Sequence, residues 1–134
     1  MLDKLAKEFD FQQRAMDLRA YRAEVLSSNI ANADTPNYKA VDFDFRQALQ
    51  AGQQEQQRLQ LVRSDARHFE SADSQTLQAK LQYRQAVQPS LDGNTVDMDV
   101  ERGAFTDNAL KYEATLTFLN KHLSLLNTAI TSGS

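Results

Sequence analysis

The chain has 134 residues, a length typical of a single domain, and 41% of them are hydrophobic. Its formal net charge of -3 at pH 7 excludes a global basic field of the kind that attracts nucleic acid or an anionic membrane. The absence of cysteine excludes disulfides, thiolate nucleophiles and the common structural zinc sites.

The first element is a long helix predicted over residues 1–33. Apolar residues recur there at spacings of three and four, which is the pattern of a coiled-coil helix, and a second row widens the face to be buried. An ordinary amphipathic helix packed on one core is the alternative. The first row is Leu2, Leu5, Phe9, Gln12, Met16, Arg19, Ala23, Leu26 and Ile30, and the second is Phe11, Ala15, Leu18, Arg22 and Val25.

The start of this helix mixes charged with apolar residues and offers no continuous apolar segment, so a secretory signal peptide is not expected. No stretch of the chain approaches the ~18–20 apolar residues that are needed to span a bilayer. We expect a protein that is cytoplasmic, or that leaves the cytoplasm by a route without a cleaved signal.

Residues 27–39 form a corner at the end of the first helix. Asn32 is suited to a left-handed C-cap, and Pro36 follows within the distance at which helices commonly stop. Thr35 precedes the proline and is therefore expected in extended geometry. We expect the chain to turn sharply here.

An irregular connector is predicted over residues 34–96. Val41, Phe43 and Phe45 alternate with polar residues, which predicts a short extended segment with one buried face.

The middle of this connector is polar. The Gln-rich residues 47–57 are expected to form a loop, and Gly52 is expected to break any helix that crosses them. Residues 59–62 suggest a brief strand, residues 64–68 suggest a turn, and the run 89–94 combines proline with Asp-Gly-Asn in a strong turn signal.

The C-terminal helix is predicted over residues 97–134, with Asp97 as its N-cap and Gly133 near its end. Because it matches the first helix in length, we expect the two to pair as an antiparallel coiled coil. The expected fold is one mainly α domain with a short irregular and β-containing connector. Apolar rows left uncovered would face neighbouring copies. The predicted seam is Phe105, Ala109, Tyr112, Leu116, Leu119, Leu123, Leu126 and Ile130.

The chain lacks the residue patterns of catalytic and metal sites. His68 and His122 have no second histidine or cysteine at ligand spacing. A run from Asp92 resembles a calcium loop, but Val96 and Asp97 occupy the places that need an oxygen ligand and a glycine. We therefore expect no metal, no cofactor, no small-molecule substrate and no enzyme activity. The mixed charges of the first helix likewise indicate no nucleic-acid partner.

Two motifs carry a family resemblance. Residues 26–38 read LSSNIANADTPNY, and this stretch resembles the N-terminal signature of bacterial flagellar rod and hook proteins. Residues 90–101, SLDGNTVDMDVE, with NALKY at 108–112, are similar to the C-terminal part of a proximal rod member of that family. The family usually has glycine after the proline of the corner, where this chain has Asn37, a residue that tolerates left-handed backbone.

The resemblance implies a structural subunit of the flagellar proximal rod, assembled helically through its terminal helices. It implies export by the flagellar type III apparatus and a place in the periplasmic rod of the basal body. The implied partners are copies of itself, other rod proteins, the protein that joins the rod to the inner-membrane ring, and the export gate. Another proximal rod component of the same family, or a free-standing cytoplasmic helical adaptor or chaperone, are the alternatives.

Candidate assembly residues lie at both ends of the chain, and Phe9 and Phe11 are candidates for recognition by the export gate. In the N-terminal helix and corner the assembly candidates are Leu5, Phe9, Met16, Leu26, Asn29, Ile30, Asn32, Thr35, Pro36 and Tyr38. In the C-terminal region they are Asp92, Gly93, Asn94, Val96, Asp97, Tyr112, Leu116, Leu119, Leu123, Leu126 and Ile130.

Overall fold

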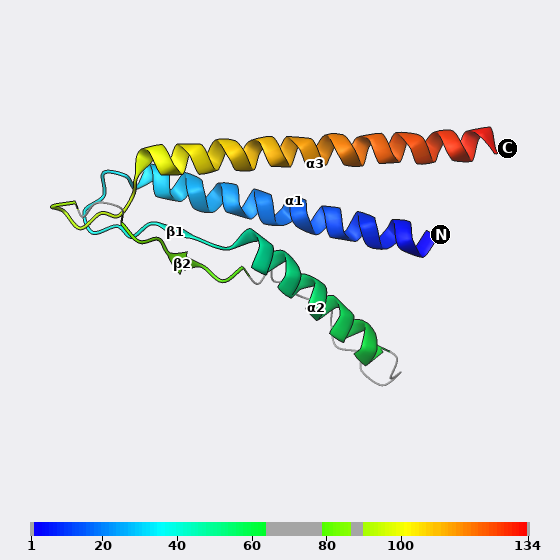
Figure 1. Cartoon of the computed structure of the whole chain (residues 1–134), viewed down its shortest axis with the longest axis horizontal. Coiled ribbons are helices and arrows are strands. Elements are labelled where there is room, and N and C mark those ends of the chain that lie inside the picture. The colour runs from blue at the N-terminus through cyan, green and yellow to red at the C-terminus, as the bar shows by residue number, and fades with distance from the viewer. Residues whose placement is uncertain (1, 64–78, 87–89, 134) are drawn as a thin grey trace.

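A computed structural model describes residues 2–63, 79–86 and 90–133. Two long helices lie side by side and antiparallel, so that both chain termini are at the same end (Figure 1). The predicted mainly α fold, with paired terminal helices and a short β-containing connector, is confirmed. The elements are α1 (Leu2–Ala31), β1 (Val41–Asp42), α2 (Phe45–Arg63), β2 (Gln82–Tyr83) and α3 (Met98–Ser132).

The first turn of α3 is fixed by local hydrogen bonds, as its sequence predicts. The Asp97 carboxylate accepts hydrogen bonds from the main-chain N–H groups of Asp99 (3.0 Å) and Val100 (3.3 Å). Asp99 and Glu101 add negative charge where the helix dipole favours it. The helix then runs for 35 residues against 30 in α1, and its C-terminal end reaches beyond the start of α1 (Figure 1).

The core lies between α1, β1 and α2. Leu18 and Val25, from the second apolar row of α1, are buried together with Phe43, whose ring stacks on Tyr21 at 5.5 Å between centroids. Figure 1 shows α2 diverging from the pair of long helices, and α2 contacts α1 but not α3 among the described residues. One face of α1 is therefore covered by α3 and the other by α2 and β1.

The prediction of a loop over residues 47–57 is wrong, because α2 runs through them without a break. A β-carbon at Gly52 would lie 2.8 Å from Cδ of Arg14, a flexible side chain of α1 that could shift aside, so Gly52 lies where α2 passes close to α1. Packing of Ala48 and Leu49 on the core outweighs the low helix propensity of glycine, which costs about 1 kcal/mol.

The remaining connector predictions are partly confirmed. The extended segment exists at Val41–Asp42, which pairs antiparallel with Gln82–Tyr83, but Phe45 already begins α2. Residues 59–62 belong to α2 and not to a strand. The predicted turn over residues 64–68 lies outside the described residues.

The left-handed residue of the corner is Asn37, with φ at 62°, and not Asn32 as predicted. Asn32 ends α1 in another way, because its side-chain amide donates to the carbonyl oxygen of Ser28 at 2.8 Å. The side chain therefore satisfies a carbonyl of the last turn without left-handed backbone. Asn37 occupies the position at which the resembling family usually has glycine.

Candidate functional site

The two sequence motifs interlock through Asn94, which is 6% exposed. Its side-chain amide donates to three main-chain carbonyls that follow the end of α1, those of Asn32 (3.0 Å), Ala33 (2.9 Å) and Thr35 (2.8 Å). Its own Oδ1 accepts from the N–H of Val96 at 2.8 Å. One side chain thus ties together the backbone of the corner, where the carbonyls of Asn32 and Thr35 also accept main-chain N–H groups.

Main-chain hydrogen bonds run alongside this contact. The N–H of Asn37 donates to the carbonyl of Asp92 at 2.9 Å, and the N–H of Thr95 donates to the carbonyl of Tyr38 at 3.0 Å. Gly93 has φ at 75°, and a β-carbon there would lie 2.7 Å from Oδ1 of Asn37. Both the backbone conformation and the available space therefore call for glycine at residue 93.

A polar junction joins α1, β1, the segment after β2, and α3. We define it as Arg22, Asn29, Asp42, Arg84 and Glu101. Arg22 donates twice to the carboxylate of Asp42, at 3.1 and 3.0 Å, and Arg84 donates to the same carboxylate. Arg84 also lies 3.0 Å from Oε1 of Glu101, an ion pair whose angle does not make a hydrogen bond.

The deepest members of the junction are Glu101 and Asn29, each 0% exposed. Asn29 donates to Oε2 of Glu101 at 3.2 Å and to the carbonyl of Val41 at 2.7 Å. Its Oδ1 accepts from the N–H of Val41 at 3.1 Å and from the hydroxyl of Tyr38 at 3.2 Å. A buried charge persists at low cost only with such partners, so this network fixes where α3 starts relative to α1.

The charged groups of the junction shift one another's pKa values. Burial opposes ionisation of Asp42, but hydrogen bonds from Arg22, the Phe43 N–H and Arg84 outweigh it and hold the pKa of the carboxyl below its usual value. The same hydrogen bond raises the pKa of Arg22. Paired charges and bonded amides of this kind hold chain segments together.

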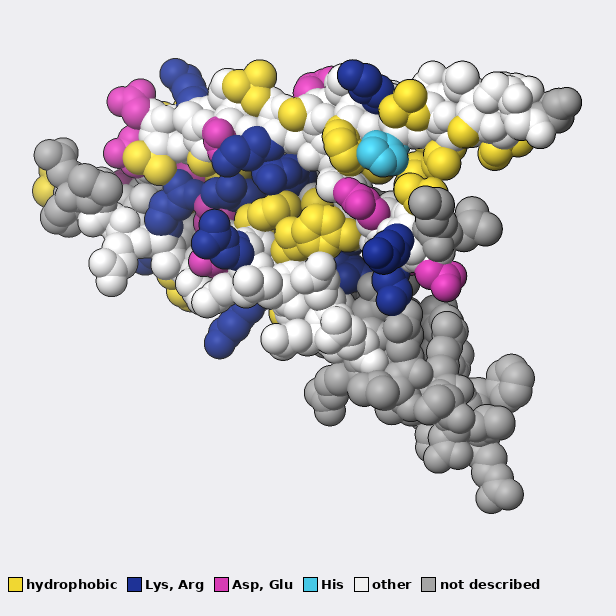
Figure 2. Space-filling view, turned by 45° about the vertical axis from the view of Figure 1, so that its right-hand side comes forward, with side chains coloured by type: hydrophobic (Ala, Val, Ile, Leu, Met, Phe, Trp, Pro, Cys, Tyr) yellow, Lys and Arg dark blue, Asp and Glu magenta, His cyan; other side chains and the backbone are white. Residues whose placement is uncertain are grey.

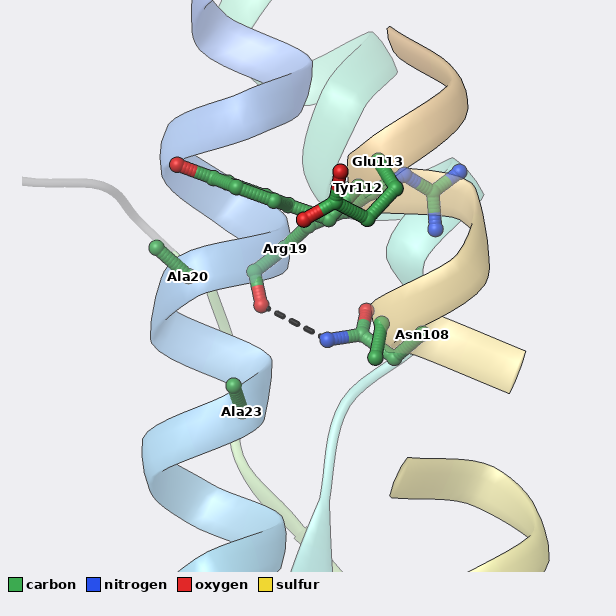
Figure 3. Close-up of a pocket in the computed structure, with 7 residues that line it drawn as sticks. Arg19, Ala20, Ala23, Asn108, Tyr112 and Glu113 are labelled. Carbon is green, nitrogen blue, oxygen red and sulfur yellow. Dashed lines mark hydrogen bonds between the residues drawn. The ribbon is translucent and has the colours of Figure 1, made fainter. Parts of the chain in front are cut away.

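A second feature is a hollow between the middle of α1 and α3, with a volume of about 310 Å³. Figure 3 shows Asn108 reaching from α3 to α1, where it donates to the carbonyl of Arg19 at 2.8 Å. Asn108 is 1% exposed, and its Oδ1 has no hydrogen-bond partner among the described residues. The lining residues are Arg19, Ala20, Ala23, Asn108, Ala109, Tyr112 and Glu113.

The predicted seam of α3 faces α1 only in part. Within the single chain the half-buried members are Tyr112, Leu116, Leu119 and Leu126, whereas Phe105, Ala109, Leu123 and Ile130 are exposed. The fully buried positions of α3 are Glu101 and Asn108.

Apolar side chains therefore remain open to solvent along α3, as Figure 2 shows. Ten large hydrophobic residues are exposed in the described part of the chain, and seven of them lie on this one helix. They are Val100, Phe105, Leu110, Phe118, Leu123, Leu125 and Ile130.

The predicted residues of the corner and of the turn at 90–97 come together, whereas those near the chain start lie far along α1. Buried among the predicted residues are Leu26, Asn29 and Asn94; half-buried are Leu5, Phe9, Phe11, Met16, Ile30, Asn32, Tyr38, Gly93 and Val96; exposed are Thr35, Pro36, Asp92 and Asp97.

Sequence reasoning missed the charged members of the junction and Asn108. Arg22 interrupts an apolar row of the first helix, which is a usable signal for a buried cation seeking a partner. Asp42 alternates with buried apolar residues but faces the junction. Nothing in the local sequence marks Arg84 or Glu101, because their partners are distant along the chain.

Among the described residues there is neither a candidate membrane span nor a cluster of metal-ligating side chains. None of their helices combines the length and the apolar character required to cross a membrane. Across the same residues, no three His, Asp or Glu side chains gather in a way that could hold a metal ion.

Comparison with known proteins identifies the family of this chain. The model of a family described as flagella basal body rod protein matches residues 9–39, which include the corner. The flagellar basal body rod protein FlgB of Proteus mirabilis (strain HI4320) is 44% identical over 137 residues, spanning 99% of this chain and 100% of the relative. FlgB of Escherichia coli (strain K12) is 44% identical over the whole of both chains, and FlgB of Aeromonas hydrophila is 46% identical over 92% of each. The chain therefore belongs to the FlgB family of flagellar basal body rod proteins.

Proposed function

We propose that this chain is a structural subunit of the flagellar proximal rod that assembles with its neighbours chiefly through α3. Membership in the FlgB family supports a structural role in the rod of the basal body. The observation that carries the assembly role is the row of large apolar side chains that α3 leaves exposed. Exposed apolar surface of this extent is typical of protein interfaces.

The two ends of the helical pair have different tasks in this proposal. The corner, the turn at 90–97 and the polar junction hold one end rigid through hydrogen bonds within the chain. The other end carries Leu123 and Ile130, exposed at 47% and 71%. A neighbouring subunit that covers them removes apolar surface from water at about 25 cal/mol per Å².

The partners and the route to the rod follow from the family. We propose contacts with copies of the chain, with other rod proteins, and with the protein that joins the rod to the inner-membrane ring. Export through the flagellar type III apparatus, without a cleaved signal, would bring the chain to the periplasm. Phe9 and Phe11 are both half-buried on α1. The export gate would therefore bind their side chains while the N-terminus is unfolded.

We also propose that the chain has no catalytic activity. The buried charges of the junction are paired, and the hollow holds no nucleophile beside a general base. A structural role in the rod requires no such catalytic groups.

The test replaces Leu123 by Asp in cells that lack the native subunit. Because Leu123 is exposed in the single chain, the helix content of the purified variant should stay unchanged. A charge in a packed interface is costly, so the variant should be missing from purified basal bodies and the cells should not swim. The matched control is Asn120→Asp, which adds the same charge to an exposed position one turn away and should assemble normally.

Wild-type swimming with Leu123→Asp would contradict the assembly role of α3. Circular dichroism and sedimentation of the unmodified chain separate the rod subunit from a free-standing adaptor. A stable dimer that never fractionates with basal bodies would favour the adaptor.

A further inference from the structure

We propose that Leu125 of one copy inserts into the hollow between α1 and α3 of the next copy. This inference rests on the proposed assembly through α3 and specifies one of its contacts. The structure places a hollow and an exposed apolar side chain on opposite sides of α3, so that one copy can present each of them to a different neighbour.

The hollow suits a bulky apolar side chain. Ala20, Ala23 and Ala109 form its small-residue wall, beside the larger side chains of Arg19, Asn108, Tyr112 and Glu113. Its volume of about 310 Å³ exceeds the roughly 150 Å³ that accommodates a benzene ring in a protein interior. It also lies directly on the contact between α1 and α3, so a third helix laid there would continue an existing helix packing (Figure 3).

Leu125 is an exposed apolar side chain of α3 with a cation, Lys121, one helical turn before it. It is 60% exposed, and Lys121 is the nearest Asp, Glu, Lys or Arg along the helix. Phe118 is less free, because its ring contacts His122 at 4.8 Å between centroids. Leu110 stands beside the ion pair of Lys111 with Asp107.

Charge supports the same pairing. Lys121 is the only Lys, Arg, Asp or Glu between residues 114 and 132, and it precedes Leu125 by one helical turn on the same side. Glu113 lies at the hollow. When Leu125 of one copy enters the hollow of another, Lys121 arrives beside a carboxylate, which orients the incoming helix.

The geometry allows this contact to repeat from one copy to the next. Leu125 and Ala109 are 16 residues apart, which places them about 160° apart around α3. One copy can therefore offer its Leu125 to one neighbour while its hollow receives another. A contact between two different surfaces repeats in one direction and builds a helical array when it does not close into a ring.

The experiment uses the natural absence of cysteine. Ala20→Cys places a thiol at the hollow, and Thr128→Cys places one a turn beyond Leu125. Within one chain the two thiols lie roughly 30 Å apart along the helices, so a short bismaleimide linker joins them only between copies. In basal bodies that carry the double variant, the linker should give a ladder of dimers, trimers and longer species. Either single variant should give no ladder.

Two further variants make the result specific. Adding Leu125→Asp should reduce the ladder on the order of tenfold, whereas adding Asn120→Asp should leave it unchanged. Glu113→Lys should weaken the ladder, and combining it with Lys121→Glu should restore it. Circular dichroism checks that helix content is preserved in each variant.

The outcomes separate this contact from the proposed function. If the double variant fractionates with basal bodies but gives no ladder, or a ladder that Leu125→Asp leaves intact, the contact is wrong and the rod role stands. If the unmodified chain is absent from basal bodies, the proposed function itself fails.

Discussion

At the scale of single residues, Asn37 shows how one backbone angle fixes the corner. Its φ of 62° is left-handed, and its N–H binds the carbonyl of Asp92. Asn tolerates this conformation better than alanine does, because its polar side chain forms local hydrogen bonds. The family pattern of glycine at this place and the observed angle therefore have the same physical cause.

Two substitutions at this position should differ. Asn37→Ala should lower the free energy of unfolding by about 1 kcal/mol, since alanine lacks the polar side chain that lets Asn tolerate positive φ. Asn37→Gly should change it by less than about 0.5 kcal/mol, because glycine adopts the angle freely but is more flexible when unfolded. Urea unfolding followed by circular dichroism measures both. Equal destabilisation by the two variants would contradict a conformational origin.

Replacing Asn94 should lower the free energy of unfolding more than replacing Asn37. Asn94→Ala removes the donor of three hydrogen bonds to the corner and the acceptor of the Val96 N–H, and a buried group that loses its partner costs about 1–3 kcal/mol. We expect unfolding to shift by about 2–3 kcal/mol, again by urea titration. Asn120→Ala makes the same chemical change on an exposed face of α3 and should shift unfolding by less than about 0.5 kcal/mol. Similar losses for the two variants would argue against the interlock.

At the scale of elements, the polar junction makes the attachment of α3 depend on pH. The folded pKa of Asp42 is depressed, so its contribution to stability is present above its unfolded pKa of about 3.9 and is lost as pH falls through the folded value. Stability measured by urea at pH 7 and at successively lower pH should therefore decline below about pH 4.

The variant Asp42→Asn identifies the group responsible. It leaves Arg22 and Arg84 without their shared carboxylate and should cost roughly 1–3 kcal/mol at pH 7. Its decline below pH 4 should be shallower than that of the unmodified chain. If the two pH profiles run parallel, Asp42 is not the titrating group. Arg46→Gln, at an exposed position of α2, serves as the control.

The elements also differ in how well their sequences specify them. The long helices α1 and α3 follow from apolar periodicity, and the start of α3 follows from Asp97. Helix α2 does not, because few of its residues are apolar and Gly52 disfavours a helix, so that the helix is held by the packing of Ala48 and Leu49 on the core. Tertiary packing overrides propensity there.

The face of α3 that meets α1 could not be predicted for a different reason. Half of its predicted seam, Phe105, Ala109, Leu123 and Ile130, is exposed in the single chain, and so the strongest hydrophobic pattern does not mark the contact within the chain. The buried positions are instead Glu101 and Asn108, whose partners Arg84, Asn29 and Arg19 stand elsewhere in the sequence. Periodicity cannot identify a buried polar residue whose partner is remote.

At the scale of the whole molecule, stability is unevenly distributed along the helical pair. Hydrogen bonds and ion pairs concentrate where the corner, the turn at 90–97 and the start of α3 meet. Toward the termini, α3 exposes Leu125 and Ile130 and extends past α1 (Figure 1). Local opening requires little free energy where few apolar contacts are buried. The far end should therefore open more easily than the interlocked end.

Amide hydrogen exchange should reveal this gradient and its loss on assembly. In the isolated chain, residues 116–132 should exchange at least about tenfold faster than residues 98–108, because the former lack the junction and the covering neighbours. In purified basal bodies the difference should shrink, since binding to the folded form suppresses opening. The variant Leu123→Asp blocks the proposed assembly through α3. Its residues 116–132 should therefore keep their fast exchange when it is mixed with unmodified chain. Uniform protection in the isolated chain would mean that α3 needs no neighbour to be stable, and its exposed apolar row would then need another explanation.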